Sequence, residues 1–271
     1  MSDHNYSSNN PGLNASPSTD YTLLVKIGVD AFSYAIADQD KVILLKEGVT
    51  LVELAEPSVE NGVLATGYKK CIVGLPDTGF TFIPLSLFNP EKAADFARFL
   101  DVKPDEKVFS QPLDTENQVI FKVKSSIADI VDSKFNLDNV VFAPAGWIKL
   151  TAANYPDNQR LYVNVDGDHA EILNFRNGKL RFYNSFEFKN ADELAYFIVV
   201  VTGELGLQPQ DITILLSGGI TPEDINGTRL AQFFGKVELN YMSTLTLPDR
   251  APAHQLLTLT ALSLCGSSEV V

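Results

Sequence analysis

Backbone amides and carboxylates at a tight turn between two strands are groups that can hold a phosphate with its magnesium ion. The stretch LLVKIGVDAFSYAI, residues 23–36, predicts such a turn, with Gly28 and Asp30 at its tip. A glycine lets backbone N–H groups approach an anion closely. Asp30 would face phosphate oxygens with like charge unless a metal ion lay between them. The turn is a candidate phosphate site, and an ordinary hairpin is the alternative.

A second candidate turn lies in NVDGDHAEI, which starts at Asn164. Asn164, Asp166 and Gly167 are its candidate binding residues. A solvated hairpin turn is the simpler interpretation, because Asp and Gly are common in turns. A metal site made of Asp166, Asp168 and His169 is a further alternative, although neighbouring residues on a strand point to opposite faces and rarely converge.

The third candidate is the turn in LLSGGITPEDI, where Gly218 and Gly219 end a predicted strand and a helix follows. Thr221 is the expected N-cap of that helix, and the first helical turn would offer free backbone N–H groups to a ligand. Glycines also serve strand-to-helix turns that need a positive φ. A purely structural turn is therefore the alternative.

No other pattern predicts a catalytic or metal centre. The chain lacks the motifs G-x-x-x-x-G-K-[ST], G-x-G-x-x-G and G-x-S-x-G. Its three histidines, His4, His169 and His254, have no metal-ligand partner at a suitable spacing. We therefore predict no catalytic residue and no metal site from these side chains.

The elements that would position the candidate residues follow one pattern twice. Each half begins with three β runs joined by short turns, and the Asn177-Gly178 dipeptide predicts one of these turns. Helices and strands alternate afterwards. In the second half, Asn190 is the expected N-cap of the first helix and Gly206 its C-terminal stop.

A three-strand meander followed by alternating helices and strands predicts a mixed sheet with helices on both faces. This is the order of a ribonuclease H-like domain. We expect an α/β protein of two such domains in tandem, each with a mixed five-stranded sheet flanked by helices. The expected domains are 21–153 and 158–266, with a disordered tail at 1–20 and a frayed tail at 267–271.

At these residues the chain resembles two groups of proteins. Residues 22–265 resemble the actin-like ATPase fold, which is a tandem of ribonuclease H-like domains. The segments FTFIPLSLFNPEKAADFARFL, NVVFAPAGW, ITILLSGGI and HQLLTLTALSLC resemble a Bacteroidetes family, domain of unknown function 3822. These resemblances imply a fold rather than a reaction.

Actin-like ATPases place one hairpin of each domain against the nucleotide phosphates, and this chain departs from both hairpins. The acidic residue that organises magnesium in the first hairpin is Lys26 here, and an ammonium group cannot ligate a cation. In the second hairpin Asn164 takes the place of an aspartate, and only Gly167 remains of several glycines. By the same resemblance, Gly218 and Gly219 belong to the adenosine-contacting turn.

Composition excludes several classes of partner. The chain has 34 Asp and Glu against 21 Lys and Arg, a net charge of −13, which argues against nucleic acid and anionic membrane surfaces. No apolar run reaches membrane-spanning length, and no signal peptide is predicted. Cys71 and Cys265 lie far apart in apolar runs, as expected for buried thiols in a reducing compartment. We therefore expect a cytoplasmic protein.

The sequence favours a non-catalytic interaction or assembly module with degenerate phosphate motifs and no cofactor. Its partner would be another protein, and a homodimer is an open alternative. The competing hypothesis is an ATP-dependent phosphotransferase or ATPase that uses ATP and Mg²⁺ in an interdomain cleft. In that case Asp30, Asn164 or Asp166 would organise the magnesium ion.

Overall fold

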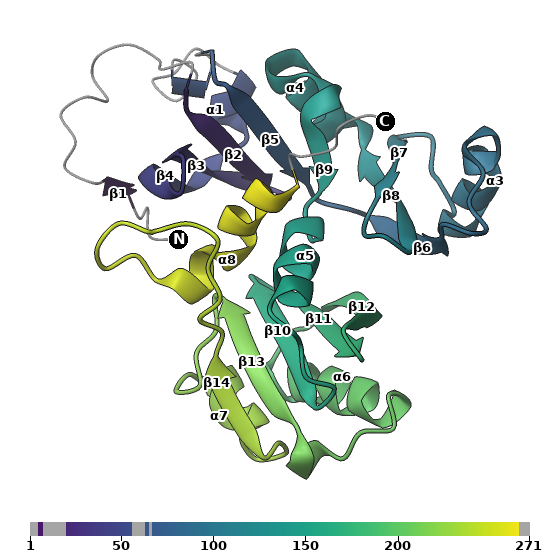
Figure 1. The fold of residues 1–271 in the computed structure, drawn as a ribbon, viewed down its shortest axis with the longest axis vertical. Coiled ribbons are helices and arrows are strands. Elements are labelled where there is room, and N and C mark those ends of the chain that lie inside the picture. The colour runs from purple at the N-terminus through teal and green to yellow at the C-terminus, as the bar shows by residue number, and fades with distance from the viewer. Residues whose placement is uncertain (1–4, 8–19, 56–62, 65–66, 266–271) are drawn as a thin grey trace. The chain divides into compact units, whose positions relative to one another are not determined.

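The computed structural model describes residues 5–7, 20–55, 63–64 and 67–265, and it divides into two compact units (Figure 1). Unit 1 comprises Met1–Gly146, Leu245–Ala251 and Leu259–Val271, and unit 2 comprises Trp147–Thr244 and Pro252–Thr258. The helix α8 (Ala253–Ala261) therefore begins in unit 2 and ends in unit 1. None of the described helices is long and apolar enough to cross a membrane.

The main sheet of unit 1 has six strands in the order β1-β4-β3-β2-β5-β9. The strands are β1 (Asn5–Ser7), β2 (Thr22–Ile27), β3 (Ala31–Asp38), β4 (Lys41–Thr50), β5 (Lys70–Leu75) and β9 (Val140–Phe142). β2, β3 and β4 form an antiparallel meander, whereas β5 and β9 continue parallel to β2. Leu23, Leu24 and Val25 in β2 are fully buried, which is expected of a central strand covered on both faces.

The strand β1 lies within the segment 1–20 that the sequence predicts to be disordered. Asn5–Ser7 pairs antiparallel with β4 and adds the sixth strand to the sheet. The remainder of that predicted tail, apart from Asp20, and the predicted tail 267–271 lie outside the described residues. The short helix α1 (Val52–Ala55) follows β4.

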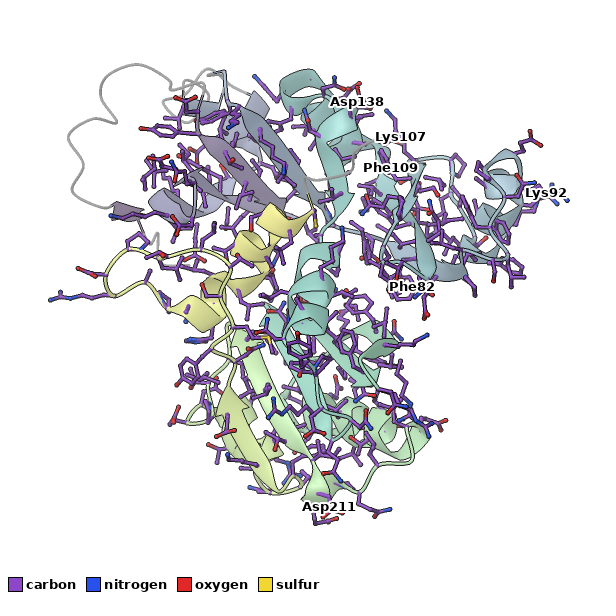
Figure 2. The ribbon with its side chains drawn as sticks, in the orientation of Figure 1. Phe82, Lys92, Lys107, Phe109, Asp138 and Asp211 are labelled. Carbon is purple, nitrogen blue, oxygen red and sulfur yellow. The ribbon has the colours of Figure 1, made fainter. Side chains whose placement is uncertain are left out.

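A separate sheet is inserted between β5 and β9 of unit 1. Its order is β6-β8-β7, with β6 (Gly79–Pro84), β7 (Glu106–Pro112) and β8 (Asn117–Lys124). The helical segments of this region are η2 (Pro90–Lys92), α3 (Ala93–Ala97), η3 (Arg98–Leu100), α4 (Ser125–Phe135) and η4 (Leu137–Asn139). Figure 2 labels Phe82 on β6 and Phe109 on β7. Phe109 stacks on Phe121 at 5.5 Å, and Phe121 meets Phe142 of β9 at 5.3 Å, so aromatic rings join the inserted sheet to the main one.

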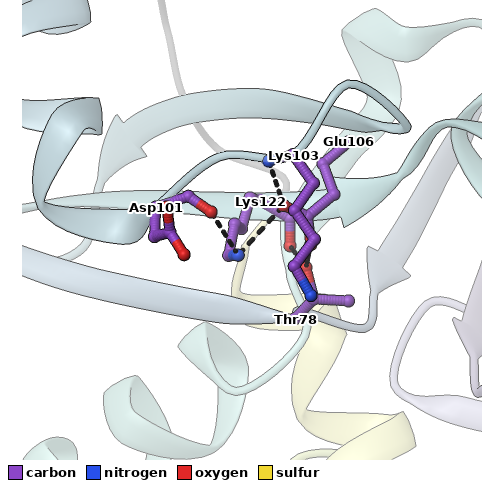
Figure 3. A network of polar contacts seen from close by, with 5 residues as sticks. All are labelled: Thr78, Asp101, Lys103, Glu106 and Lys122. Carbon is purple, nitrogen blue, oxygen red and sulfur yellow. Dashed lines mark hydrogen bonds and ion pairs between the residues drawn. The ribbon is translucent and has the colours of Figure 1, made fainter.

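A buried ion pair ties the strands of the inserted sheet together (Figure 3). Lys122 Nζ lies 2.9 Å from Glu106 Oε2, and their side chains are 8% and 6% exposed. Glu106 also accepts hydrogen bonds from the Lys103 backbone N–H (2.8 Å) and the Thr78 hydroxyl (2.7 Å). These two hydrogen bonds and the Lys122 ammonium lower the pKa of Glu106 to about 2. Lys122 Nζ donates a second bond to the Asp101 carbonyl oxygen at 3.3 Å.

Unit 2 repeats the strand order of the main sheet of unit 1. Its order is β12-β11-β10-β13-β14, with β10 (Arg160–Asp166), β11 (His169–Arg176), β12 (Lys179–Glu187), β13 (Thr213–Gly218) and β14 (Lys236–Leu239). The strand directions match those of β4-β3-β2-β5-β9. This match confirms the predicted fold class of two α/β units with mixed sheets. The predicted hairpin turn has the expected positive φ at Asn177 (54°) and Gly178 (76°).

The helices of unit 2 cover a sheet whose two faces differ in polarity. The helical segments are α5 (Ala145–Ala153), which begins at the unit boundary, α6 (Ala191–Glu204), η5 (Pro209–Asp211) and α7 (Ile225–Leu230), and η6 (Leu262–Leu264) follows α8. Leu161, Val163 and Val165 of β10 pack with α6 and α7 in one apolar core. Because side chains alternate along a strand, Tyr162 and Asn164 point to the opposite face. The expected N-cap is confirmed, since Asn190 accepts a hydrogen bond from Glu193 N at 3.0 Å.

Candidate functional site

The first predicted phosphate turn, between β2 and β3, is closed by its own backbone. Gly28 N donates to the Ala31 carbonyl oxygen at 2.8 Å, and Leu51 N donates to the Asp30 carbonyl oxygen at 3.2 Å. A Cβ atom on Gly28 would lie 2.9 Å from that Ala31 oxygen, so the glycine permits the closure. The Asp30 side chain is exposed at the turn. The glycine N–H is thus already bonded within the hairpin.

The second predicted phosphate turn joins β10 and β11 through Gly167 and Asp168. Gly167 has φ +63°, and no atom lies within 4 Å of where its Cβ would be, so the backbone conformation alone favours glycine. Asp166 ends β10 and is exposed. Asp168 Oδ1 lies 2.7 Å from His169 Nδ1. Across the described chain no three His, Cys, Asp or Glu side chains are grouped to hold a metal ion, so Asp166, Asp168 and His169 do not form the alternative metal site.

A buried hydrogen-bonded chain starts at Asn164, two residues before the end of β10. Asn164 is 1% exposed, and its Nδ2 donates to Glu171 Oε2 at 2.6 Å. Tyr183 donates its hydroxyl proton to Glu171 Oε1, also at 2.6 Å. The ring of Trp147, on α5, lies 6.5 Å from the Tyr183 ring. Within the part of the chain that the structure describes, Asn164 Oδ1 is buried and has no hydrogen-bond partner.

The predicted glycine turn after β13 lies beside Asn164. Gly218 has φ +80°, and a Cβ there would be 2.1 Å from the Val165 carbonyl oxygen and 2.9 Å from Asn164 Oδ1. Gly219 N donates to the same Val165 oxygen at 2.7 Å. Gly218 is therefore explained by the close approach of β13 to β10, which is the structural alternative for this turn.

The helix after this turn begins later than the sequence predicts. Asp224, not Thr221, is the N-cap of α7: its Oδ1 accepts from Gly227 N at 2.8 Å, and its Oδ2 accepts from Thr221 N at 2.7 Å. The prediction of a Thr221 cap is wrong because a carboxylate can bond both N–H groups at once. Thr221 N, at the helix start that was expected to offer N–H groups to a ligand, is bonded instead by the protein's own carboxylate.

Polar residues lie in register across the sheet of unit 2 at the level of Asn164. Asn164 is opposite Glu171 and Ser217, and Glu171 is opposite Ser185. The pairing of β13 with β14 places Asn240 next to Ser217. Residues in register point to the same face, so these five side chains form one polar row.

Sequence reasoning missed Glu171 and Tyr183, although a signal for Glu171 was available. A two-residue turn at Gly167 and Asp168 places residue 171 directly opposite Asn164. Of the predicted site residues, the structure brings together Asn164, Gly218 and Gly219. Asp166 and Gly167 lie at the exposed end of the same hairpin, whereas Gly28 and Asp30 belong to unit 1.

The chain matches a family model described as a protein of unknown function (DUF3822) over residues 9–237. The chain belongs to the DUF3822 family. No curated protein sequence matches this DUF3822 chain.

Solved structures show the fold of this DUF3822 protein. A Bacteroides thetaiotaomicron VPI-5482 protein with actin-like ATPase fold and unknown function is 22% identical, with a TM-score of 0.72, and the match covers 91% of this chain and 96% of that one. A chain of the PilM–PilN type IV pilus biogenesis complex is 13% identical, with a TM-score of 0.56 and coverage of 90% and 98%. The DUF3822 chain therefore has the actin-like ATPase fold.

At the positions that the resemblance gives to the magnesium-organising carboxylates, this DUF3822 protein carries other side chains. The place of the first carboxylate holds Lys26, whose ammonium cannot ligate a cation. The place of the second holds Asn164, whose amide donates its hydrogen bond to Glu171. The helix start that would offer N–H groups is capped by Asp224.

Proposed function

We propose that this DUF3822 protein is a non-catalytic interaction module that uses the actin-like fold as a scaffold. The observation that supports the proposal most is the state of Asn164. A buried amide that donates to Glu171 stands where the fold's nucleotide-binding members need a carboxylate for the metal ion. A neutral amide oxygen carries no negative charge and therefore holds a cation less strongly than a carboxylate would.

Two further features support a role in assembly. The first hairpin bonds its own glycine N–H, and the Asp224 carboxylate would repel a phosphate at the start of α7. A chain of similar fold was solved as part of a PilM–PilN complex, so this fold can serve in a complex with another protein. By this analogy the function would be to bind a protein partner.

Cysteine chemistry supports a cytoplasmic location for this activity. Neither Cys71 nor Cys265 forms a disulfide bond. Burial raises the pKa of Cys71 to about 12, so its thiol stays protonated and unreactive at neutral pH. Two thiols outside any disulfide suit a reducing compartment.

The second candidate function is an ATPase or phosphotransferase, and Glu171 is the observation that favours it. Glu171 places a carboxylate directly beside Asn164, on the neighbouring strand, so an acidic group is present near the expected metal place. In this hypothesis Glu171 takes the role predicted for Asp30, Asn164 or Asp166. Tyr183 would then orient the carboxylate.

Phosphate release from ATP in the presence of magnesium separates the two candidates. The interaction module is expected to release no phosphate above the rate without protein, in the wild type and in Glu171→Gln alike. Hydrolysis by the wild type that Glu171→Gln abolishes would overturn the proposal in favour of the second candidate. Glu187→Gln serves as the matched control, because Glu187 is an exposed glutamate at the end of β12 and is not a candidate binding residue.

A further inference from the structure

The helices α6 and α7 of unit 2 lie side by side and carry large apolar side chains that point into solvent. On α6, Tyr196 is 63% exposed and Val200 is 42% exposed. Ile225 on α7 is 79% exposed, and Phe233 just beyond α7 is 37% exposed. These four residues are called the α6–α7 surface below. An apolar group of this kind on two adjacent helices indicates a contact site.

The core of unit 2 does not account for the α6–α7 surface. On its inward side α6 carries Leu194, Ala195 and Ile198, which are all buried in the core of unit 2. Tyr196 and Val200 lie four residues apart, on the opposite side of the helix. A helix that is apolar on all sides is expected to be buried on all sides, whereas α6 exposes one side.

The duplicated fold offers an internal comparison for this surface. The helix α4 of unit 1 precedes the last parallel strand β9, as α7 precedes β14. Its exposed residues are Ser126, Asp129, Asp132, Ser133 and Lys134. Because every exposed residue of α4 is polar, the fold does not require an apolar residue such as Ile225 at the place of α7. The place of α6 is different, since Val52 on α1, the helix after the meander of unit 1, is 62% exposed.

Arg229 joins the two helices within this surface. Its Nε lies 2.7 Å from Asp192 Oδ1 on α6, and its guanidinium lies 4.9 Å from the centre of the Phe233 ring. The side chain is thus held by an ion pair and a cation–π contact. Such a fixed arrangement reduces the conformational entropy that a partner would have to overcome on binding.

Acidic residues outnumber basic ones in the segment that carries the α6–α7 surface. From Lys189 to Lys236 the acidic residues are Asp192, Glu193, Glu204, Asp211, Glu223 and Asp224, and the basic residues are Lys189, Arg229 and Lys236. The Arg181 guanidinium lies at the end of α6, where it donates to the Leu205 carbonyl oxygen. Arg229 is already paired with Asp192. A partner with complementary charge must therefore carry Lys or Arg around its apolar contact residues.

We propose that the α6–α7 surface binds an amphipathic helix of a partner protein, with an apolar stripe flanked by Lys and Arg. Rows of side chains on two packed helices form ridges and grooves that accept the ridges of a third helix. Tyr196 is the central anchor, because exposed aromatic residues dominate binding energy at such contacts. This inference rests on the proposed interaction function and names its surface.

Binding of a synthetic helix tests the surface directly. The probe is a labelled peptide of about 18 residues with Leu at helical spacing and Lys on the flanks, long enough to form a helix. A scrambled peptide of the same composition has equal charge and no stripe. The stripe peptide is expected to bind the wild-type full chain at least about tenfold more tightly than the scrambled one, and Tyr196→Glu or Ile225→Glu removes that difference.

Control variants keep the outcome unambiguous. Tyr155→Asn changes an even more exposed tyrosine elsewhere in unit 2, at a φ of 49° that Asn accepts, and should bind as the wild type does. Tyr196→Ala and Ile225→Ala repeat the loss without adding charge. If both peptides bind equally well, or if the variants leave binding unchanged, the proposal that this surface is a binding site is wrong.

Sedimentation tests whether the occupant is a second copy of this chain. If the wild type forms dimers and Tyr196→Glu makes them dissociate, a second copy rather than a separate partner protein binds the surface. None of these outcomes depends on ATP hydrolysis, which tests the proposed function itself.

Discussion

The two units share one strand order, yet they differ in how their buried polar groups are bonded. In unit 1, Lys122 and Glu106 form a buried pair whose members are also bonded by neighbouring groups. In unit 2, buried polar atoms such as Trp147 Nε1, Asn164 Oδ1 and Asn174 Oδ1 lack a hydrogen bond among the described residues. Such atoms call for a water molecule or another partner. The inserted sheet of unit 1 thus bonds its buried ion pair with its own groups, whereas unit 2 leaves several buried polar atoms unbonded within the described chain.

The largest effect is expected from a methyl group at the closest approach of β13 to β10. Gly218→Ala places a Cβ 2.1 Å from the Val165 carbonyl oxygen at φ +80°, so unit 2 should lose at least about 3 kcal/mol of unfolding free energy. Trp147 is the only tryptophan and is buried in unit 2, so its fluorescence during urea unfolding reports this unit.

Gly167→Ala is the matched control for that experiment. Gly167 also has a positive φ, but its Cβ would meet nothing within 4 Å, so only the backbone cost of about 1 kcal/mol is expected. Equal losses of stability for the two variants would show that close packing of β13 against β10 is not the reason why position 218 requires glycine.

Acid should break the polar network of unit 1 before any change in unit 2. The pKa of Glu106 is lowered from 4.5 to about 2 in the folded state, so its contribution to stability is complete above about 4.5 and is lost as the pH falls towards 2. The protection of the β7 and β8 amides against hydrogen exchange, relative to the intrinsic exchange rate, should fall over that range. Glu106→Gln should remove this pH dependence. Asp129→Asn breaks the exposed Lys107–Asp129 pair and should leave the profile unchanged.

A smaller effect is expected from restoring the carboxylate in unit 2. Asn164→Asp replaces the amide nitrogen that lies 2.6 Å from Glu171 Oε2 by a carboxylate oxygen, so the two acids repel and the pKa of one must rise. Unit 2 should lose about 2 kcal/mol at neutral pH, and the loss should shrink as the pH falls and one acid is protonated. The urea concentration at the unfolding midpoint, followed by Trp147 fluorescence at acid and at neutral pH, measures the loss and its pH dependence.

The double variant Asn164→Asp, Glu171→Gln is the control, because it exchanges the amide and the acid between the two strands. It should recover most of the lost stability. A stable single variant at neutral pH would mean that Glu171 is not held against residue 164.

Much of the fold could be predicted from local patterns. The three-strand meanders, the Asn177-Gly178 turn and the Asn190 cap all have signals within a few residues. No local sequence signal predicts the separate sheet of β6, β8 and β7, because the residue patterns of its strands do not differ from those of the strands in the main sheets. Which sheet they join is decided by contacts distant in sequence, such as that between Phe121 and Phe142.

The site was predicted less well than the fold, for two physical reasons. The cap of α7 was misplaced because the Asp224 carboxylate bonds both Thr221 N and Gly227 N, so the helix begins after Asp224 rather than after Thr221. Glu171 was missed because it belongs to the candidate site through its cross-strand neighbour Asn164 and not through a sequence motif. The placement of Gly218 beside Asn164 results from the pairing of β13 with β10, which no local motif predicts.

The most direct test of the central claim, that this fold no longer works through a nucleotide, is the melting temperature of the wild-type chain with millimolar ATP and magnesium. Magnesium alone is the reference. A ligand present at 100 times its Kd adds about 2.7 kcal/mol, which corresponds to a rise of about 5 °C or more. The account predicts the same melting temperature in both solutions. A rise of that size, lost in Glu171→Gln, would contradict it.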